Sequence, residues 1–278
     1  MKLPLLFKVY RRTLALTSYV LPSYVGVLNA KRFMTPTRHQ RPEWEKKIIA
    51  GSEEKTLTSQ VKSWHWGSSG PKILLVHGWD GRGSQLGFFV APLVAAGFHV
   101  IAIDGPAHGD SPGNRTNLRE FAEKMLATQQ ELGQLYGIIA HSFGCAATAL
   151  AADNGLITQK IVLISSPCDL QNIFDRFSNF MQLSPKSKYY FQHFVETEAR
   201  LNVKETRIHE LIARIPHPIM VIHDQDDPEI PYSDALKLTQ NLAHVKFVAT
   251  KGLGHRRILK SSQVVEQVIH FMGENSCG

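Results

Sequence analysis

From Gln60 onward, short apolar runs alternate with longer segments of helical periodicity, and this alternation constrains the fold more than any other feature. The runs are rich in branched aliphatic residues and end at Gly, Pro, Asp or His, as buried strands of a parallel sheet require. They are Lys72–Val76, His99–Ile103, Tyr136–Ile139, Lys160–Ile164, Ile219–Ile222 and Val245–Ala249. Residues 118–132 and 264–272 carry apolar side chains at helical spacing. The sequence therefore predicts a mostly parallel, doubly wound α/β sheet.

The stretch from Ser166 to Arg214 interrupts this rhythm, because it is longer than an ordinary crossover helix. Seven of the chain's 25 aromatic residues lie within positions 174–194. We therefore predict a small helical cap inserted before the strand Ile219–Ile222. Its large apolar side chains are either the core of the insertion or the lining of an apolar substrate pocket. The candidates for that lining are Phe174, Phe177 and Met181.

The positive charge of the chain is concentrated near its start. The formal net charge is +7, and residues 1–41 hold eight of the 31 Lys and Arg residues but no Asp or Glu. The remaining 23 basic residues face 24 acidic ones, so the body is close to neutral. A nucleic-acid-binding groove should spread basic residues over the main domain, and we expect no nucleic-acid partner. The predicted regions are an arm at 1–59, an α/β core at 60–165 and 215–275, and the cap at 166–214.

Two interpretations of the basic arm remain open. Its residues 13–30 are uncharged, but Pro22 and several polar residues make the stretch a poor membrane span. A cleaved secretion signal is a further, weaker alternative. The arm either packs on the body as helices or lies at an anionic membrane surface. Because the three cysteines, Cys145, Cys168 and Cys277, lack the spacing of a metal site, we expect a reduced, cytoplasmic setting, peripheral to a membrane if the second interpretation holds.

One polar residue stands out where a predicted strand meets a helix. The strand Tyr136–Ile139 runs into Ala140-His141-Ser142-Phe143-Gly144 and then into a helix-like, alanine-rich segment. This order resembles the nucleophile turn of α/β-hydrolases, in which small residues flank a serine in strained geometry. Ala140 replaces the usual first glycine but is still small. The resemblance implies that Ser142 is the nucleophile and that the N–H of Phe143 helps to bind an oxyanion.

Two loops after earlier strands extend the resemblance. His77-Gly78-Trp79 follows the first predicted strand and is similar to the His-Gly-aromatic loop of the family, which implies that the backbone of Trp79 is the second oxyanion donor. His77 is interpreted as a structural residue that braces this loop. Residues 104–111, DGPAHGDS, resemble another family loop whose role is structural, and we therefore do not interpret Asp104 and His108 as a catalytic pair.

The acid and base of the predicted site follow the last two strands. Residues 223–231, HDQDDPEIP, resemble the acid-bearing loop of the family, and alignment on their ends gives Asp227 as the catalytic acid. Asp226 and Asp169 are the alternatives, whereas Asp224 and Glu229 are interpreted as solvated turn carboxylates. Residues 252–255, GLGH, place His255 as the catalytic base before the last helix, in the chain order Ser, Asp, His that this fold demands.

Taken together, residues 60–275 resemble the α/β-hydrolase superfamily, and Phe33-Met34-Thr35-Pro36 resembles an arm of some uncharacterised bacterial members. The resemblance implies a serine hydrolase that cleaves a small-molecule carboxylic ester through an acyl-enzyme, of esterase, lipase or lysophospholipase type, without metal or organic cofactor. The alternatives are an acyltransferase, a thioesterase, a C–C bond hydrolase or a non-catalytic binding protein. The sequence indicates neither the natural substrate nor the oligomeric state.

Overall fold

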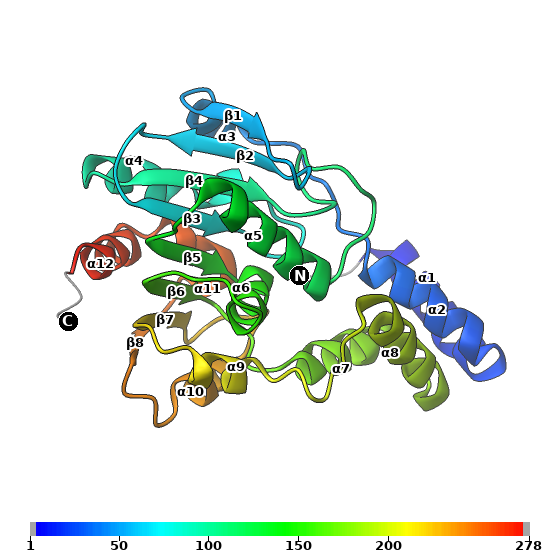
Figure 1. Ribbon diagram of the computed structural model, residues 1–278. Helices are drawn as coiled ribbons and strands as arrows, with labels where there is room; N and C mark the ends of the chain where they lie inside the picture. The colour runs from blue at the N-terminus through cyan, green and yellow to red at the C-terminus, as the bar shows by residue number, and fades with distance from the viewer. Residues whose placement is uncertain (1–3, 275–278) are drawn as a thin grey trace.

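The computed structural model describes residues 4–274 and contains one eight-stranded sheet (Figure 1). The strands run in the spatial order β1-β2-β4-β3-β5-β6-β7-β8, and all pairs are parallel except those that β2 makes with β1 and β4. Their bounds are β1 Glu53–Thr56, β2 Lys62–Trp66, β3 Lys72–Val76, β4 His99–Asp104, β5 Gly137–His141, β6 Lys160–Ile164, β7 Ile219–Asp224 and β8 Val245–Thr250. The predicted α/β fold class is confirmed. Lys2, Leu3 and Cys277 lie outside the described residues.

Helices cover both faces of the sheet because the side chains of each central strand alternate between two cores (Figure 1). In β3, for example, Ile73 and Leu75 face one core, while Leu74 and Val76 face the other. The first core packs on α3 (Glu43–Ile49), η1 (Gly83–Phe89), α4 (Val90–Ala95), η2 (Ile258–Lys260) and α12 (Ser262–Gly273). The second packs on α5 (Leu118–Leu132), α6 (Phe143–Asp153), α9 (Ile208–Arg214) and α10 (Tyr232–Thr239).

All six predicted strands are present, but two strands of the sheet were missing from the sequence prediction. β1 consists of Glu-Glu-Lys-Thr at the edge of the sheet, and all four residues are exposed, so no apolar pattern marks it. β2 begins ten residues before the first predicted strand, and its buried tryptophans alternate with polar residues rather than forming an apolar run. Because β1 pairs with β2, its residues belong to the sheet, although the sequence places them in the predicted arm.

Between β6 and β7 the chain forms α7 (Leu170–Met181) and α8 (Pro185–Ala199) before α9. Asp169 caps α7 by accepting a hydrogen bond from the N–H of Asn172 at 2.8 Å, and Ser184 with Pro185 starts α8 in the usual way. These two helices lie away from the sheet, beside α1 (Leu5–Val20) and α2 (Pro22–Phe33) (Figure 1).

α2 packs closely against α8, and Gly26 lies at the closest approach. A Cβ atom at this position would lie 2.6 Å from both the carbonyl oxygen of Ser187 and the Cβ of Tyr190. Hydrogen bonds hold the same junction: Ser184 donates its hydroxyl to the buried carbonyl of Ser18 at 2.7 Å, and Ser187 donates to the carbonyl of Pro22 at 2.9 Å. The arm helices are therefore built into the cap.

This close packing can be tested with the Gly26→Ala variant. In a helix interior, Gly→Ala normally stabilises by about 1 kcal/mol. Here we expect the opposite sign, a destabilisation of about 1–3 kcal/mol from overpacking, measured by urea unfolding. Gly273→Ala is the matched control: an added Cβ at the end of α12 would meet no other heavy atom within 4 Å, and the variant should not be destabilised. A stabilised Gly26→Ala protein would show that α2 is not held against α8.

Candidate active site

Ser142 lies in a strained turn between β5 and α6, with φ 53° and ψ −119°. Its backbone N–H donates to the carbonyl of Ile164 in the next strand at 2.9 Å. Two glycines let neighbouring backbones approach the turn. A Cβ at Gly144 would lie 2.5 Å from the carbonyl oxygen of His77, and one at Gly78 would lie 2.9 Å from the Cβ of Ser142. A non-glycine residue at this φ is uncommon and marks a position whose conformation the surroundings impose.

The three predicted catalytic side chains are hydrogen-bonded in series. Ser142 Oγ lies 2.9 Å from His255 Nε2, and His255 Nδ1 lies 2.7 Å from Asp227 Oδ2. The other oxygen of Asp227 accepts from the N–H groups of Glu229 at 2.8 Å and Ile230 at 2.9 Å. Because an ionised carboxylate only accepts hydrogen bonds, the neutral form of the imidazole holds its proton on Nδ1, which leaves Nε2 able to accept from the serine hydroxyl.

The environment keeps Asp227 ionised. Burial by itself would raise the pKa of this carboxyl, but the hydrogen bond and charge of His255, with the two backbone N–H groups, lower the pKa to about 2. The carboxylate is therefore negatively charged throughout the neutral range, where it can orient the imidazole and stabilise its protonated form.

The two alternative acids have other partners. Asp226 accepts from the N–H of Gly252 at 3.0 Å, and Asp169 caps α7 and lies 3.5 Å from the Lys237 ammonium. Within residues 4–274, no carboxylate other than Asp227 is hydrogen-bonded to His255. The structure thus brings Asp227, and neither alternative, to the histidine.

Asp224 differs from the sequence interpretation. It is fully buried rather than solvated, and it accepts hydrogen bonds from the N–H groups of Gly254 (2.9 Å) and Leu253 (3.0 Å) and from the hydroxyl of Thr250 (2.7 Å). Burial would raise the pKa of this carboxyl, but these bonds lower it. Asp224 therefore fixes the turn that carries His255, a role that the sequence pattern did not indicate. Glu229, interpreted in the same way, is indeed half-exposed.

Two further histidines brace the site. His141 donates from Nε2 to the carbonyl oxygen of His255 at 2.8 Å. Burial and the charge of His255 lower the pKa of His141 to about 3, so the ring is neutral. His77 is buried, donates from Nδ1 to the carbonyl of Gly78 and accepts at Nε2 from the N–H of Gly105 at 2.8 Å. The sequence analysis did not assign His141 a role, although its place beside Ser142 was a usable signal.

The predicted oxyanion donors are available. Phe143 is the first residue of α6, where the helix leaves N–H groups unpaired, and its ring packs against that of Trp79 with centroids 5.0 Å apart. Across the described chain, neither the N–H of Phe143 nor that of Trp79 has a hydrogen-bond partner. Both residues line cavities that reach Ser142.

On one side of Ser142 lies an apolar cavity of about 200 Å³. Its walls come from the core, from the cap and from the end of α2, and they include Phe33, Met34, Phe143, Leu170, Phe174 and Val195. Of the predicted lining residues, only Phe174 takes part. Phe177 and Met181 do not line this cavity but contact the arm: Phe177 packs on Phe33, and Met181 on Leu14 and Val25. Conversely, Phe33 and Met34 line it although the sequence analysis did not propose them.

A polar cavity of about 330 Å³ lies on the other side of the serine. Trp44, Arg82, Glu229, Arg256 and Lys260 are among its lining residues, together with His255. Within residues 4–274, no three His, Cys, Asp or Glu side chains are grouped so that they could hold a metal ion.

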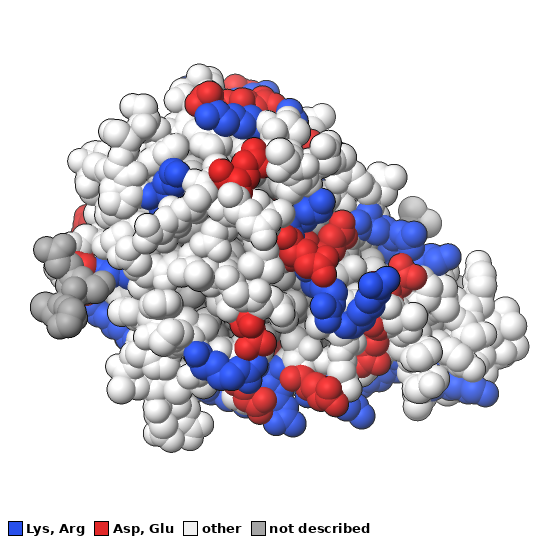
Figure 2. Space-filling model, in the orientation of Figure 1, with Lys and Arg blue, Asp and Glu red and all other residues white. Residues whose placement is uncertain are grey.

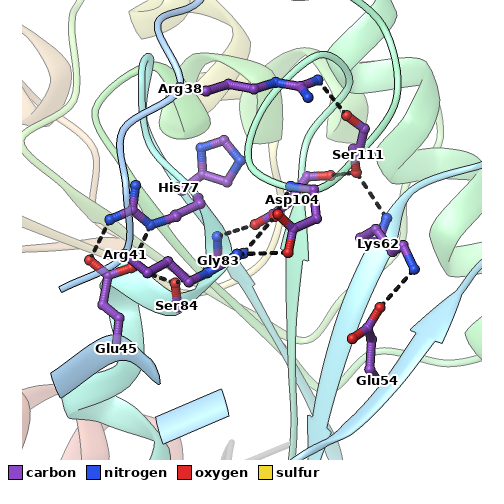
Figure 3. A network of polar contacts seen from close by, with 12 residues as sticks. Arg38, Arg41, Glu45, Glu54, Lys62, His77, Gly83, Ser84, Asp104 and Ser111 are labelled. Atoms are coloured by element: carbon purple, nitrogen blue, oxygen red, sulfur yellow. Dashed lines mark hydrogen bonds and ion pairs between the residues drawn. The ribbon is translucent and has the colours of Figure 1, made fainter. Parts of the chain in front are cut away.

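A network of polar contacts, drawn in Figure 3, adjoins the polar cavity, because Glu45 and Arg82 line that cavity. Glu45 accepts from Arg82 Nε at 2.6 Å and from the Ser84 hydroxyl at 2.5 Å. Asp104 accepts from the N–H of Gly83 at 2.7 Å and from Arg41 at 3.2 Å. Burial raises the pKa of Asp104 to about 7 despite these donors. The network ties the end of the arm to the loops around the site, as expected for structural roles of residues 104–111.

Comparisons with known proteins agree with this architecture. The chain resembles a putative lipase from Acinetobacter baumannii, with 18% identity, a TM-score of 0.62, and 85% of this chain and 97% of that one covered. It is similar to a membrane phospholipase A described as a bacterial virulence factor, with 18% identity, a TM-score of 0.62, and 96% and 97% covered. An esterase from Exiguobacterium antarcticum gives 13% identity, a TM-score of 0.61, and 80% and 99% covered.

A search of curated protein sequences found no match for the chain. The model of the alpha/beta hydrolase family, in contrast, matches residues 73–268, which include Ser142, Asp227 and His255. The eight-stranded, mostly parallel sheet is consistent with the fold of that family. Because the match to the family model spans most of the chain, the chain belongs to the α/β-hydrolase family.

Proposed function

We propose that this protein is a serine hydrolase that cleaves a carboxylic ester with an apolar acyl group and a polar alcohol, through an acyl-enzyme. The observation that carries the proposal is the position of Ser142 between an apolar and a polar cavity, hydrogen-bonded to His255. An ester carbonyl placed at Ser142 would extend its acyl chain into the first cavity and its alcohol into the second. The lipase, phospholipase and esterase similarities are compatible with such a substrate.

In the proposed mechanism, His255 Nε2 takes the proton of Ser142 Oγ as this oxygen attacks the acyl carbonyl. The N–H groups of Phe143 and Trp79 stabilise the oxyanion. His255 then gives its proton to the alcohol oxygen, and the alcohol leaves. Water, deprotonated by the same histidine, attacks the acyl-enzyme and releases the acid and free Ser142.

Acyl transfer, thioester hydrolysis and C–C bond hydrolysis could use the same three residues, and assays with each substrate class would distinguish them.

The nucleophile can be tested by labelling. Ser142→Ala should abolish both fluorophosphonate labelling and hydrolysis of p-nitrophenyl esters, because it removes the attacking oxygen. The fold should be unchanged by circular dichroism, since only one hydroxyl is lost. Ser111→Ala, at a serine on the nearby structural loop, should keep its labelling. Persistent labelling of Ser142→Ala would move the nucleophile elsewhere, and an unlabelled wild type would favour a non-catalytic protein.

The acid can be tested by three matched Asp→Asn changes. Asp227→Asn should lower kcat by orders of magnitude, because the amide would favour the wrong histidine tautomer. Asp226→Asn and Asp169→Asn should each cost less than tenfold, since these carboxylates contact a backbone N–H and a helix start instead. Steady-state kinetics with one ester decide the ranking. A larger loss at position 169 than at 227 would contradict the assignment.

The apolar cavity predicts a preference for longer acyl chains. Each buried methylene contributes about 0.8 kcal/mol, nearly fourfold in kcat/KM, so hexanoyl and octanoyl esters should exceed acetyl esters. Val195→Phe, which adds volume to the cavity wall, should reduce this preference. Leu183→Phe also enlarges a side chain of the cap, but one outside the cavity, and should leave the chain-length preference unchanged. A wild-type preference for acetyl esters would count against an acyl-binding cavity.

A further inference from the structure

The helix α1 has two apolar faces, only one of which is covered by protein. Its inward face packs on the cap through Phe7, Tyr10 and Leu14. Its outward side carries large apolar side chains with high exposure: Leu5 77%, Leu6 86%, Val9 56%, Leu16 73%, Tyr19 71% and Val20 77%. At 100° per residue, Leu5, Val9, Leu16 and Val20 fall on the side opposite the buried Leu14 and Ser18.

A surface helix of a water-soluble domain normally carries polar residues on its outward face. Here the apolar surface continues past the end of α1 onto Leu21 and onto Tyr24 of α2, both more than half-exposed. Contiguous exposed apolar surface of this kind marks an interaction site rather than the isolated exposed residues found on any protein. The outward face of α1 with the tip formed by Leu21 and Tyr24 is called the apolar tip below.

The arm contributes cations and no acids to this surface: at 100° per residue Arg12 falls on the outward face among the apolar side chains, and Lys8 falls at its edge. Lys8 and Arg12 are exposed on α1, and the first 41 residues contain no Asp or Glu. Arg11 and Arg32 are partly engaged within the arm, because Arg11 donates to the carbonyl of Phe180 and Arg32 to the hydroxyl of Tyr10. In Figure 2 the end of the molecule over α2 is mostly white, with blue and a few red atoms at its margins.

The dimensions suit a helix that lies in a membrane interface. With 16 residues, α1 is about 24 Å long, and none of the described helices is long and apolar enough to cross a membrane. An amphipathic helix with Leu, Val and Tyr on one side and Lys and Arg beside them binds in the headgroup region by combining apolar burial with attraction to anionic lipids.

We propose that the apolar tip docks on the surface of an anionic membrane. A second copy of the chain is the competing occupant, but pairing two such tips would bring two sets of cations together, and the arm contributes no acid to offset them. The arm also connects this surface to the site, since α2 ends at Phe33 and both Phe33 and Met34 line the apolar cavity. Docking would hold that cavity near a lipid surface. The proposal goes beyond ester hydrolysis and does not depend on it.

The test is co-sedimentation of the full chain, as Ser142→Ala, with vesicles of phosphatidylcholine with or without phosphatidylglycerol. The inactive variant separates binding from turnover, so the result stands whether or not the protein is an esterase. We expect binding to the anionic vesicles that weakens as salt is raised, and little binding to neutral vesicles. No binding to anionic vesicles at low salt, or equal binding to both kinds, would overturn the proposal.

Matched variants locate the surface. Leu16→Glu with Val20→Glu should abolish binding, whereas Ile157→Glu with Leu236→Glu, at exposed apolar residues elsewhere (67% and 50% exposed), should not. Lys8→Gln with Arg12→Gln should weaken binding about 25-fold, from about fivefold per cation. Lys204→Gln with Lys251→Gln is the control of equal charge change. If an α1 double variant and its control lost vesicle binding equally, the assignment of this surface would be overturned. A dimer that dissociates in Leu16→Glu/Val20→Glu, with no vesicle binding by the parent protein, would also overturn it.

Discussion

The backbone strain at Ser142 is the constraint on which the geometry of the site depends. A non-glycine residue in such a conformation costs about 1–3 kcal/mol, and it persists only where the surroundings over-determine it. Here β5 is fixed between β3 and β6, and α6 is buried along most of its length. The N–H of Ser142 is also tied to β6. The strain is therefore offset by the centre of the sheet, and it leaves Oγ outside the core within reach of His255.

The position of His255 depends on groups that do no chemistry in the proposed mechanism. Asp224 holds the N–H groups just before the histidine, while His141 holds its carbonyl oxygen. Asp227 then needs to fix only the ring, through one short hydrogen bond. Because these contacts come from the ends of β5 and β7 and meet in the turn after β8, the site tolerates little relative movement of these three parts. A parallel sheet with two covered faces provides that rigidity.

Residues whose place follows from a strand end could be predicted from the sequence, whereas residues placed by tertiary contacts could not. Ser142, Asp227 and His255 each follow a predicted strand, and strand ends can be recognised from apolar runs alone. The burial of Asp224 could not be recognised, because a carboxylate in a polar turn looks the same whether backbone N–H groups or water surround it. β1 is exposed and polar, so only its pairing with β2 defines it. Phe33 and Met34 line the same cavity as residues more than a hundred positions later in the chain, such as Ser142 and Phe174. No local sequence pattern contains such a long-range contact.

The arm has several structural roles at once, so its proposed membrane contact has to be tested by substitutions rather than by deletion. Phe33 forms part of the apolar cavity, Arg41 reaches the buried Asp104, and Trp44 and Glu45 line the polar cavity. Deleting residues 1–41 would therefore remove a cavity wall and a buried ion-pair partner as well as the exposed apolar surface of α1. Loss of lipid binding in such a truncation would not separate docking from a collapsed cap. Substitutions on the outward face of α1 leave those internal contacts in place, because Leu16 and Val20 point away from them.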